Sequence, residues 1–498
     1  MMNDREFDRV LEAELSAMPL PVSMVEEVNP WRTAVKRIVW GLALTTITFH
    51  FLYLDYILPV IGNLLLWMGL RTLRRENGWF TACWCISLLD LVVVFGCLAM
   101  NATIWRDDAV ELVLSYIGVI LTLVQIFAFW RGIKAVRRAA GQEEQAGAAG
   151  ALVIWYIIML PMALLQVQGW LFLLPILISY GLILWSLTRV SALLDGVGYQ
   201  IKAAPVWVSD RPAWVSYVVI LSLSIVIVGT FFTSYPMEWT PIDAQEQAGL
   251  EDVKEHLLEL GFPEYVLEDL TPEDLAELKD AQWVKVEMDA YYLDDGDLNH
   301  AAALSTTDLS DEKYRLLNTS VAVLLPDDQW MVIHHFRWLG EPEHYSTEAM
   351  EIWPTYVNNE GYEGDGTFTG RLLYDQDGVT YTGDYWLFEW QDYTYTDTFF
   401  GNSSRRMGLY AAWSHPRNGE NCRGYVAYLA EQVNNDQWLF DSWMNFTYQE
   451  TMVNYPAVSA LEYVHRGTWN GNGVFRTHYD AIQFRPCEEL PLELVESE

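Results

Sequence analysis

A change in charge and hydropathy near residue 234 constrains this chain more than any other feature. Residues 235–498 contain 49 of the 66 acidic residues but only 14 of the 30 basic ones, a net charge of −35, while residues 1–234 carry −1. The near-neutral part contains long apolar stretches, whereas the acidic part alternates polar and apolar residues. We therefore expect a multi-pass protein of the lipid bilayer that carries one large, water-exposed acidic domain.

Seven stretches approach the roughly 20 apolar residues that a spanning helix needs. They predict an α-helical transmembrane bundle of about seven spans over residues 38–233, after a cytoplasmic tail of residues 1–37. The first and second spans, and the fifth and sixth, are expected to form tight hairpins. The stretches are Ile38–Leu54, Ile57–Leu73, Phe80–Met100, Ala109–Trp130, Ala151–Gln166, Trp170–Leu187 and Pro212–Phe232.

Basic residues near the spans predict the orientation, because short loops rich in Lys and Arg stay in the cytoplasm. With seven spans, the basic clusters around Arg37, Arg74, Arg137 and Arg211 fall on one side, and the opposite short loops hold only Arg106. The N-terminus is then cytoplasmic and the acidic domain extracytoplasmic. Because the first 30 residues contain no apolar core of a signal peptide, we expect the first span to direct insertion.

Asp90 is the clearest polar residue inside a predicted span. Ionisable groups at membrane depth are costly and often functional, so one hypothesis is a role in transport or gating. The other is that Asp90 is protonated or bonded to Thr45, Thr46 and Thr48 and holds helices together. Cys83, in the same span, belongs to no CxxC motif and is expected to pack as a small residue.

The cytoplasmic tail contains a short amphipathic segment over residues 5–18. Phe7, Leu11 and Leu15 recur at helical spacing with charged residues between them. An isolated helix of this length is marginal in water, so it should dock on something. It either lies on the membrane or contacts a cytoplasmic protein such as a sigma factor, and its mixed charge slightly favours the protein.

Three segments of the membrane half carry a resemblance to a known group of proteins. Residues 28–46, 70–80 and 198–210, with motifs such as Asn29-Pro-Trp31 and Leu70-Arg71-Thr-Leu-Arg74, resemble uncharacterised polytopic membrane proteins of Gram-positive anaerobes. Such proteins are associated with extracytoplasmic-function sigma factors. The resemblance implies a signalling role and brings no catalytic residues with it.

Residues 234–282 are expected to form a helical linker or hairpin between membrane and sheet. A helix is predicted over residues 243–260, and Gly261 supplies its left-handed stop. Thr271 followed by Pro272 is typical of an N-cap and first helical position, so a second helix should begin there.

Residues 283–498 predict an extracytoplasmic β-rich domain with an acidic C-terminal tail. Several runs alternate with period two, and turn signals such as Asp375-Gln-Asp-Gly378 separate them. Many strands without intervening helices favour an antiparallel sandwich or a strongly curved sheet. The fold class is therefore a helical membrane bundle followed by an α+β domain dominated by antiparallel sheet.

The aromatic run from Tyr385 to Trp390 is the candidate ligand-facing element. Strand alternation would put Trp386 and Trp390 on one face and Tyr385 on the other. Aromatic platforms beside Asp, Asn and Gln suit a glycan or a peptidoglycan fragment. The alternative is ordinary sandwich core.

The rest of the sequence gives little indication of a catalytic or metal-binding site. His334 and His335 are adjacent in a predicted strand, so they point to opposite faces and cannot share a metal. The sequence contains no HExxH, GxSxG or Gly-rich phosphate motif. The calcium-loop fragments at 294–299 and 375–378 fit turns better. We expect no enzyme activity, no cofactor and no nucleic-acid partner.

Cys422 and Cys487 are the two cysteines of the acidic domain. In an oxidising compartment a disulfide between them would close a loop of about 65 residues and contribute roughly 4 kcal/mol. Two free buried thiols are the alternative.

These features favour a membrane sensor or regulator, in which the outer domain senses an envelope ligand or stress and the tail contacts a partner. The alternative function is a cell-surface binding or envelope-maintenance protein without signalling output.

Overall fold

The computed structural model describes most of the chain in two compact units. One unit reaches Asn101 and resumes from Arg106 to Ile227, and the other comprises Ala102–Trp105 and Val228–Glu498. The described residues are 30–47, 51–142, 147–164, 170–196, 204, 208–243, 245–292, 302–303, 314–340, 342, 344–354, 356–357, 360–396, 403–433, 439–466 and 473–491. The tail residues Phe7, Leu11 and Leu15 lie outside them.

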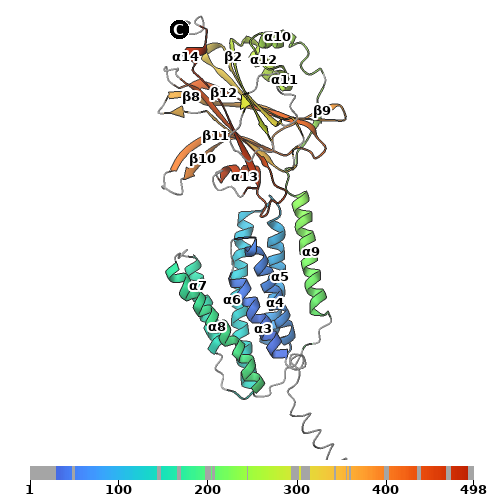
Figure 1. Ribbon diagram of the computed structural model, residues 1–498, viewed down its shortest axis with the longest axis vertical. Helices are drawn as coiled ribbons and strands as arrows, with labels where there is room; N and C mark the ends of the chain where they lie inside the picture. Colours follow the sequence, from blue (N-terminus) through green and yellow to red (C-terminus); the bar gives the residue numbers. More distant parts are fainter. Residues whose placement is uncertain are drawn as a thin grey trace, which may run out of the picture. The chain divides into compact units, whose positions relative to one another are not determined.

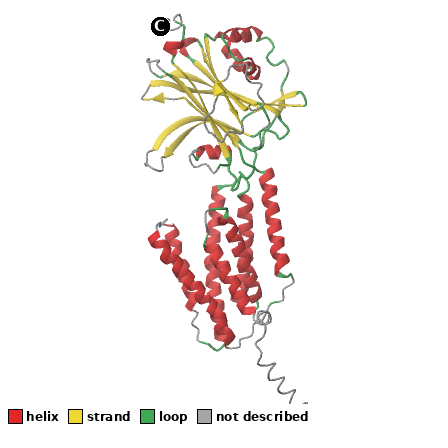
Figure 2. Ribbon diagram, in the orientation of Figure 1, coloured by secondary structure: helices red, strands yellow, loops and turns green. Residues whose placement is uncertain are grey.

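The first unit is entirely helical where it is described (Figures 1 and 2). Five of its helices are long and apolar enough to cross a membrane, namely α4, α5, α6, α8 and α9. Helix α3 has 17 residues and the apolar part of α7 is shorter than a span, so seven spans are not confirmed. The helices are α3 (Pro30–Thr46), α4 (Leu54–Leu73), α5 (Gly78–Met100), α6 (Asp108–Ala139), α7 (Gly147–Leu164), α8 (Trp170–Gly196) and α9 (Asp210–Phe231).

The first helix lies eight residues nearer the N-terminus than the apolar stretch predicted. It begins at Pro30, and the next helix starts only after Leu52 and Tyr53, whose φ angles are 51° and 58°. Positive φ is incompatible with a right-handed helix, so the chain turns at these residues rather than at Asp55. The predicted hairpin itself forms, because α3 and α4 pack against each other.

Small residues allow α3 and α4 to approach closely. A Cβ atom on Gly62 would lie 2.9 Å from the carbonyl oxygen of Gly41, so only glycine fits there. At one end of these helices, Asp210 at the start of α9 forms ion pairs with Arg37 and Arg71. These two ion pairs therefore link α3, α4 and α9.

The second unit is a sandwich of two antiparallel sheets (Figure 2). One sheet has nine strands in the order β1-β9-β8-β12-β5-β4-β2-β3, with β7 beside β8, and the other has the order β10-β11-β6-β13-β14. The strands are β1 (Thr240–Pro241), β2 (Trp283–Tyr292), β3 (Ala302–Ala303), β4 (Tyr314–Leu324), β5 (Trp330–Trp338), β6 (Glu348–Pro354), β7 (Tyr356–Val357), β8 (Glu360–Gln376), β9 (Val379–Gly383), β10 (Leu387–Thr396), β11 (Ser403–Trp413), β12 (Glu420–Gln432), β13 (Phe440–Gln449) and β14 (Phe475–Phe484). The predicted antiparallel β-rich domain is confirmed.

Aromatic side chains fill the space between the sheets. Phe336 of β5 stacks on Trp413 of β11 at 4.9 Å between ring centroids, and Phe446 of β13 packs on both. The predicted turn at 375–378 joins β8 to β9. Its central residues, Asp377 and Gly378, both have positive φ, as a two-residue hairpin requires.

Helices α10 (Glu251–Glu259), α11 (Glu264–Asp269) and α12 (Pro272–Glu277) cover the outer face of the nine-stranded sheet (Figure 1). The Thr271 cap is confirmed, since its hydroxyl accepts a hydrogen bond from the Asp274 amide at 3.1 Å. Leu257 and Val266 pack with Val321 on the sheet. These helices are thus part of the β-rich unit rather than a separate linker. Two further helices are α13 (Ala460–His465) and α14 (Pro486–Glu489), and two single turns are η1 (Leu278–Asp280) and η2 (Pro326–Asp328).

Candidate functional site

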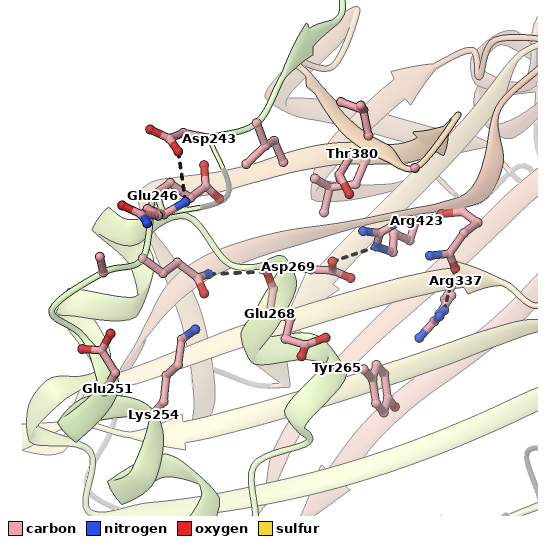
Figure 3. A pocket seen from close by; sticks show the side chains of 18 residues that line it. Asp243, Glu246, Glu251, Lys254, Tyr265, Glu268, Asp269, Arg337, Thr380 and Arg423 are labelled. Carbon is pink, nitrogen blue, oxygen red and sulfur yellow. Dashed lines mark hydrogen bonds and ion pairs between the residues drawn. The ribbon is translucent and has the colours of Figure 1, made fainter.

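The candidate site is a polar cavity of about 900 Å³ in the β-rich unit. Its wall consists of the segment before α10, parts of α10 and α11, and the ends of strands from the nine-stranded sheet (Figure 3). Lys254, Tyr265 and Asp269 line it from the helices, and Arg337 and Arg423 line it from the sheet. The cavity therefore lies between the helical layer and the nine-stranded sheet.

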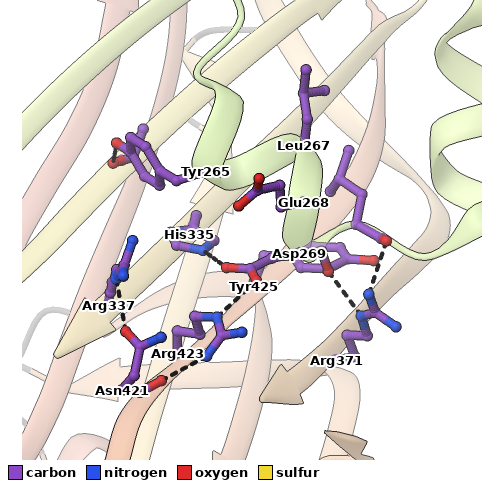
Figure 4. Close-up of polar contacts among 12 residues, drawn as sticks. Tyr265, Leu267, Glu268, Asp269, His335, Arg337, Arg371, Asn421, Arg423 and Tyr425 are labelled. Carbon is purple, nitrogen blue, oxygen red and sulfur yellow. Dashed lines mark hydrogen bonds and ion pairs between the residues drawn. The ribbon is translucent and has the colours of Figure 1, made fainter. Parts of the chain in front are cut away.

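Asp269, the last residue of α11, is the centre of the polar network (Figure 4). Its carboxylate accepts hydrogen bonds from Arg423 Nε at 2.7 Å and His335 Nε2 at 2.9 Å, and Arg371 Nε donates to its carbonyl oxygen at 2.8 Å. Burial opposes its ionisation. The hydrogen bond from His335 and the charge of Arg423 outweigh burial and hold the pKa of Asp269 below its ordinary value.

His335 is neutral in this network. Burial lowers its pKa, against the raising effect of Asp269. The proton on Nε2 points to Asp269, and Nδ1 has no hydrogen-bond partner among the described residues. The contact is therefore a hydrogen bond between an imidazole and a carboxylate, not an ion pair, and Arg423 supplies the compensating charge.

Hydrogen bonds to neighbouring side chains fix the positions of Arg337 and Arg423. Arg337 donates from Nε to Asn421 Oδ1 at 2.9 Å, and Asn421 Nδ2 donates to Asp375 at 2.7 Å. Arg423 also donates from Nη1 to Asp375 at 3.1 Å. In the described part of the chain, the terminal nitrogens of Arg337 form no hydrogen bond and Lys254 forms no ion pair. Among the described residues, the cavity thus presents the terminal nitrogens of Arg337 and the ammonium group of Lys254 without an ion-pair partner.

Carboxylates also line the cavity. Glu246 pairs with Arg371 at 2.8 Å, Asp243 accepts the Gln245 amide, and Glu251 accepts the Gly249 amide. These acceptors, together with the cations of the wall, suit a ligand that carries both hydroxyl groups and a negative charge.

The predicted aromatic platform is not assembled as one surface. Strand β10 begins only at Leu387, so alternation does not govern the two residues before it. Tyr385 is buried and donates to the Tyr425 carbonyl at 2.9 Å. Trp390 packs on Tyr428 in the inter-sheet core, whereas Trp386 is 46% exposed and stacks on Tyr235.

The predicted opposition of His334 and His335 is confirmed. His334 points between the sheets, where its ring nitrogens contact Ser320 and Ser442 at 2.8 Å each. His335 points to the helical layer and Asp269. The two imidazoles therefore belong to different networks.

Cys422 and Cys487 are free cysteines, so the predicted disulfide does not form. Cys422 lies near Tyr374 and Cys487 near Tyr362, at opposite ends of strand β8. Twelve residues of strand span about 40 Å, whereas a disulfide needs Cα atoms within about 7 Å.

Asp90 is buried in α5, and within the described residues it forms no hydrogen bond to Thr45 or Thr46. Thr45 donates to the Gly41 carbonyl at 3.0 Å, and Thr48 lies outside the described residues. Thr46 instead lies 2.6 Å from the Tyr156 hydroxyl and 2.8 Å from that of Tyr180. A three-hydroxyl contact joins α3, α7 and α8, and sequence reasoning missed it.

Sequence reasoning also missed Asp269, Arg337 and Arg423. The sequence contained only a weak indication that these residues are unusual. Arg337 and Arg423 stand among apolar and aromatic residues of strands, where charges are unusual, and Asp269 lies between Leu267 and Leu270. Nothing in the spacing indicates that the three meet.

Comparisons with known proteins add little. No family model and no curated protein matches the chain. Among solved structures, it is similar to the collagen-binding domain from a Staphylococcus aureus adhesin, at 10% identity and a TM-score of 0.17, covering 31% of this chain and 88% of that one. A pore forming protein gives 6% identity and a TM-score of 0.16, covering 40% and 90%. Likeness at this level carries no argument.

Proposed function

We propose that this chain is an integral membrane sensor or regulator whose β-rich domain, outside the cell, binds an envelope ligand in the cavity under α10 and α11. The cytoplasmic tail then contacts a partner such as a sigma factor. The ligand is a hydroxylated molecule that carries a carboxylate, the chemistry of a peptidoglycan fragment.

Arg337 and Lys254, which form no ion pair among the described residues, carry this proposal. Arg337 is fixed through Nε by Asn421, so its terminal nitrogens are oriented before a ligand arrives. Lys254 lines the same cavity from α10. A carboxylate bound to either cation forms charge-assisted hydrogen bonds, and sugar hydroxyls can donate to Glu268 and the other carboxylates of the wall.

The charge of the helical unit supports the proposed orientation. Arg37, Arg71 and Asp210 meet where the ends of α3, α4 and α9 come together. This end therefore gathers basic residues of the clusters that favour the cytoplasmic side. An odd number of crossings then puts the β-rich domain outside.

The ligand proposal is tested by calorimetric titration of the full-length protein in detergent. Muramic-acid-containing fragments should bind, and neutral N-acetylglucosamine oligomers should bind more weakly. Arg337→Gln should weaken the binding of the carboxylate ligand about 10- to 100-fold, because a hydrogen bond to a charged group contributes about 1.5–3 kcal/mol.

Arg485→Gln is the matched control, because Arg485 is about half exposed and pairs with Glu488. Equal loss in both variants would mean that only the overall charge matters. Equal binding of charged and neutral glycans by wild-type protein would contradict the carboxylate assignment.

Signalling output is tested separately, on the tail. Leu11→Glu should change transcription of a sigma-dependent regulon and reduce recovery of the partner, while ligand binding stays intact. Unaltered transcription and partner recovery would favour the second function, a surface binding or envelope-maintenance protein without output.

A further inference from the structure

A row of polar groups closes one side of the sandwich, where β2 of the large sheet faces β14 of the small one. Lys285 pairs with Glu489 at 2.6 Å at one end of this row. At the other end, the Tyr291 hydroxyl donates to the Tyr479 carbonyl at 2.8 Å, and the Tyr291 ring stacks on His478. We call this row the seam.

Two carboxyl groups meet inside the seam without a donor between them. Asp480 is 2% exposed, and its carboxyl lies within hydrogen-bonding reach of that of Asp289. One oxygen of Asp480 accepts the Ala481 amide at 2.8 Å. The other, Oδ2, has no hydrogen-bond partner among the described residues.

Asn318 adds an independent observation. It is directly opposite Asp289 in the pairing of β2 and β4, so both side chains point to the same face of the sheet. Asn318 is fully buried, yet within the described chain neither its amide oxygen nor its amide nitrogen has a hydrogen-bond partner. The Tyr291 hydroxyl lies near this amide and near both carboxyl groups.

Nearby side chains do not compensate the charge of the two carboxylates. His478 is neutral, because burial lowers its pKa to about 3. Arg476 pairs with Glu450, and Lys285 pairs with Glu489. Glu287 adds a further carboxylate to the same face of β2. A buried unpaired carboxylate and an unsatisfied amide are both costly, so the two carboxyl groups must either share a proton or bind a cation.

We propose that the seam binds a divalent cation of the calcium type through Asp289, Asp480 Oδ2 and Asn318 Oδ1. Carboxylate and amide oxygens are the ligands that Ca²⁺ prefers, and water completes its shell. Asp289 is only half buried, which leaves a side open to water. In the described residues no group of three or more His, Cys, Asp or Glu could hold a metal, so the amide is essential to the set. This site is independent of the cavity.

The experiment uses the full-length protein in detergent, first stripped with EDTA. Addition of Ca²⁺ should raise the Tm of the β-rich domain with a midpoint of roughly 0.1–1 mM, the range of extracellular sites. At tenfold excess over Kd, the expected rise is about 3–6 °C. Tb³⁺ should bind at the same place and show luminescence sensitised by Tyr291.

Asp480→Asn should abolish both the Tm shift and the Tb³⁺ signal, while Glu389→Gln, an exposed control on β10, should retain both. The Tm of Asp480→Asn in EDTA should equal or exceed that of the wild type, which shows that the variant folds. A wild-type protein that does not respond to about 10 mM Ca²⁺ would overturn the proposal and indicate a proton shared by the two carboxyls. A Ca²⁺ response that persists in Asp480→Asn would overturn it as well.

Discussion

Asp269 and Asp480 are both buried carboxylates of the β-rich unit, 4% and 2% exposed, but their surroundings have opposite effects on ionisation. Asp269 receives hydrogen bonds from His335 and Arg423, and its pKa is lowered. Asp480 faces Asp289, and burial followed by this contact raises its pKa well above the ordinary value. Burial alone therefore does not decide the charge of a carboxyl. The neighbours decide it.

The largest change in stability is expected for Asp269, the carboxylate that His335 and Arg423 compensate. Asp269→Asn should lower the free energy of unfolding by about 3–5 kcal/mol, because it removes one of the two carboxylate partners of Arg423 and the acceptor of the His335 hydrogen bond from a buried network. Denaturant titration of the full-length protein, followed by tryptophan fluorescence, measures this. A loss below about 1 kcal/mol would mean that water compensates Arg423 and that the two carboxylates are less different than they look.

The second prediction has the opposite sign. In EDTA at pH 7, Asp480→Asn should raise the free energy of unfolding by about 1–3 kcal/mol, because the Asp480 carboxyl must take up a proton or bury a charge on folding and the amide does neither. The same denaturant titration measures it. Destabilisation by a similar amount would show that Asp480 is already compensated in the absence of metal.

The pH dependence of stability should also differ in direction between the Asp269 site and the Asp480 site. The pKa of Asp269 is lowered on folding, so its contribution to stability is present above the unfolded pKa of about 3.9 and is lost as pH falls below it. The pKa of Asp480 is raised, so its contribution is present below about 3.9 and is lost as pH rises through the folded pKa. Stability of each Asn variant relative to wild type, measured from pH 3 to 8, should therefore slope in opposite directions. Parallel slopes would contradict the assignment.

The sequence predicted what depends on local pattern. Period-two alternation located several of the strands and put His334 and His335 on opposite faces, and Asp377-Gly378 predicted a hairpin turn. It also predicted the helical stop at Gly261, where φ is 90°. Each of these depends on neighbours in sequence, so the pattern is sufficient.

What depends on pairing between distant strands could not be predicted. Asp269 and Arg423 are 154 residues apart, and only the order β8-β12-β5 brings them together. The same pairing separates Cys422 from Cys487 along the length of β8. The first helix was misplaced for a different reason, since hydropathy cannot detect the left-handed residues Leu52 and Tyr53 at which the chain turns before α4.

The smallest effect is expected at the edge of the seam. Lys285 and Glu489 have side chains 27% and 37% exposed, so their ion pair is screened by water and Lys285→Met should cost only about 0–1 kcal/mol. Lys285 is four strand residues from Asp289, roughly 13 Å, and at that distance its charge opposes a divalent cation by about 0.6 kcal/mol in water. Lys285→Met should therefore tighten Ca²⁺ binding slightly, by about threefold, as calorimetry would measure. A loss of stability above about 2 kcal/mol would mean that this exposed pair is a structural contact comparable to Asp269 and Arg423. Weaker Ca²⁺ binding in the variant would mean that Lys285 positions the carboxylates rather than repelling the ion.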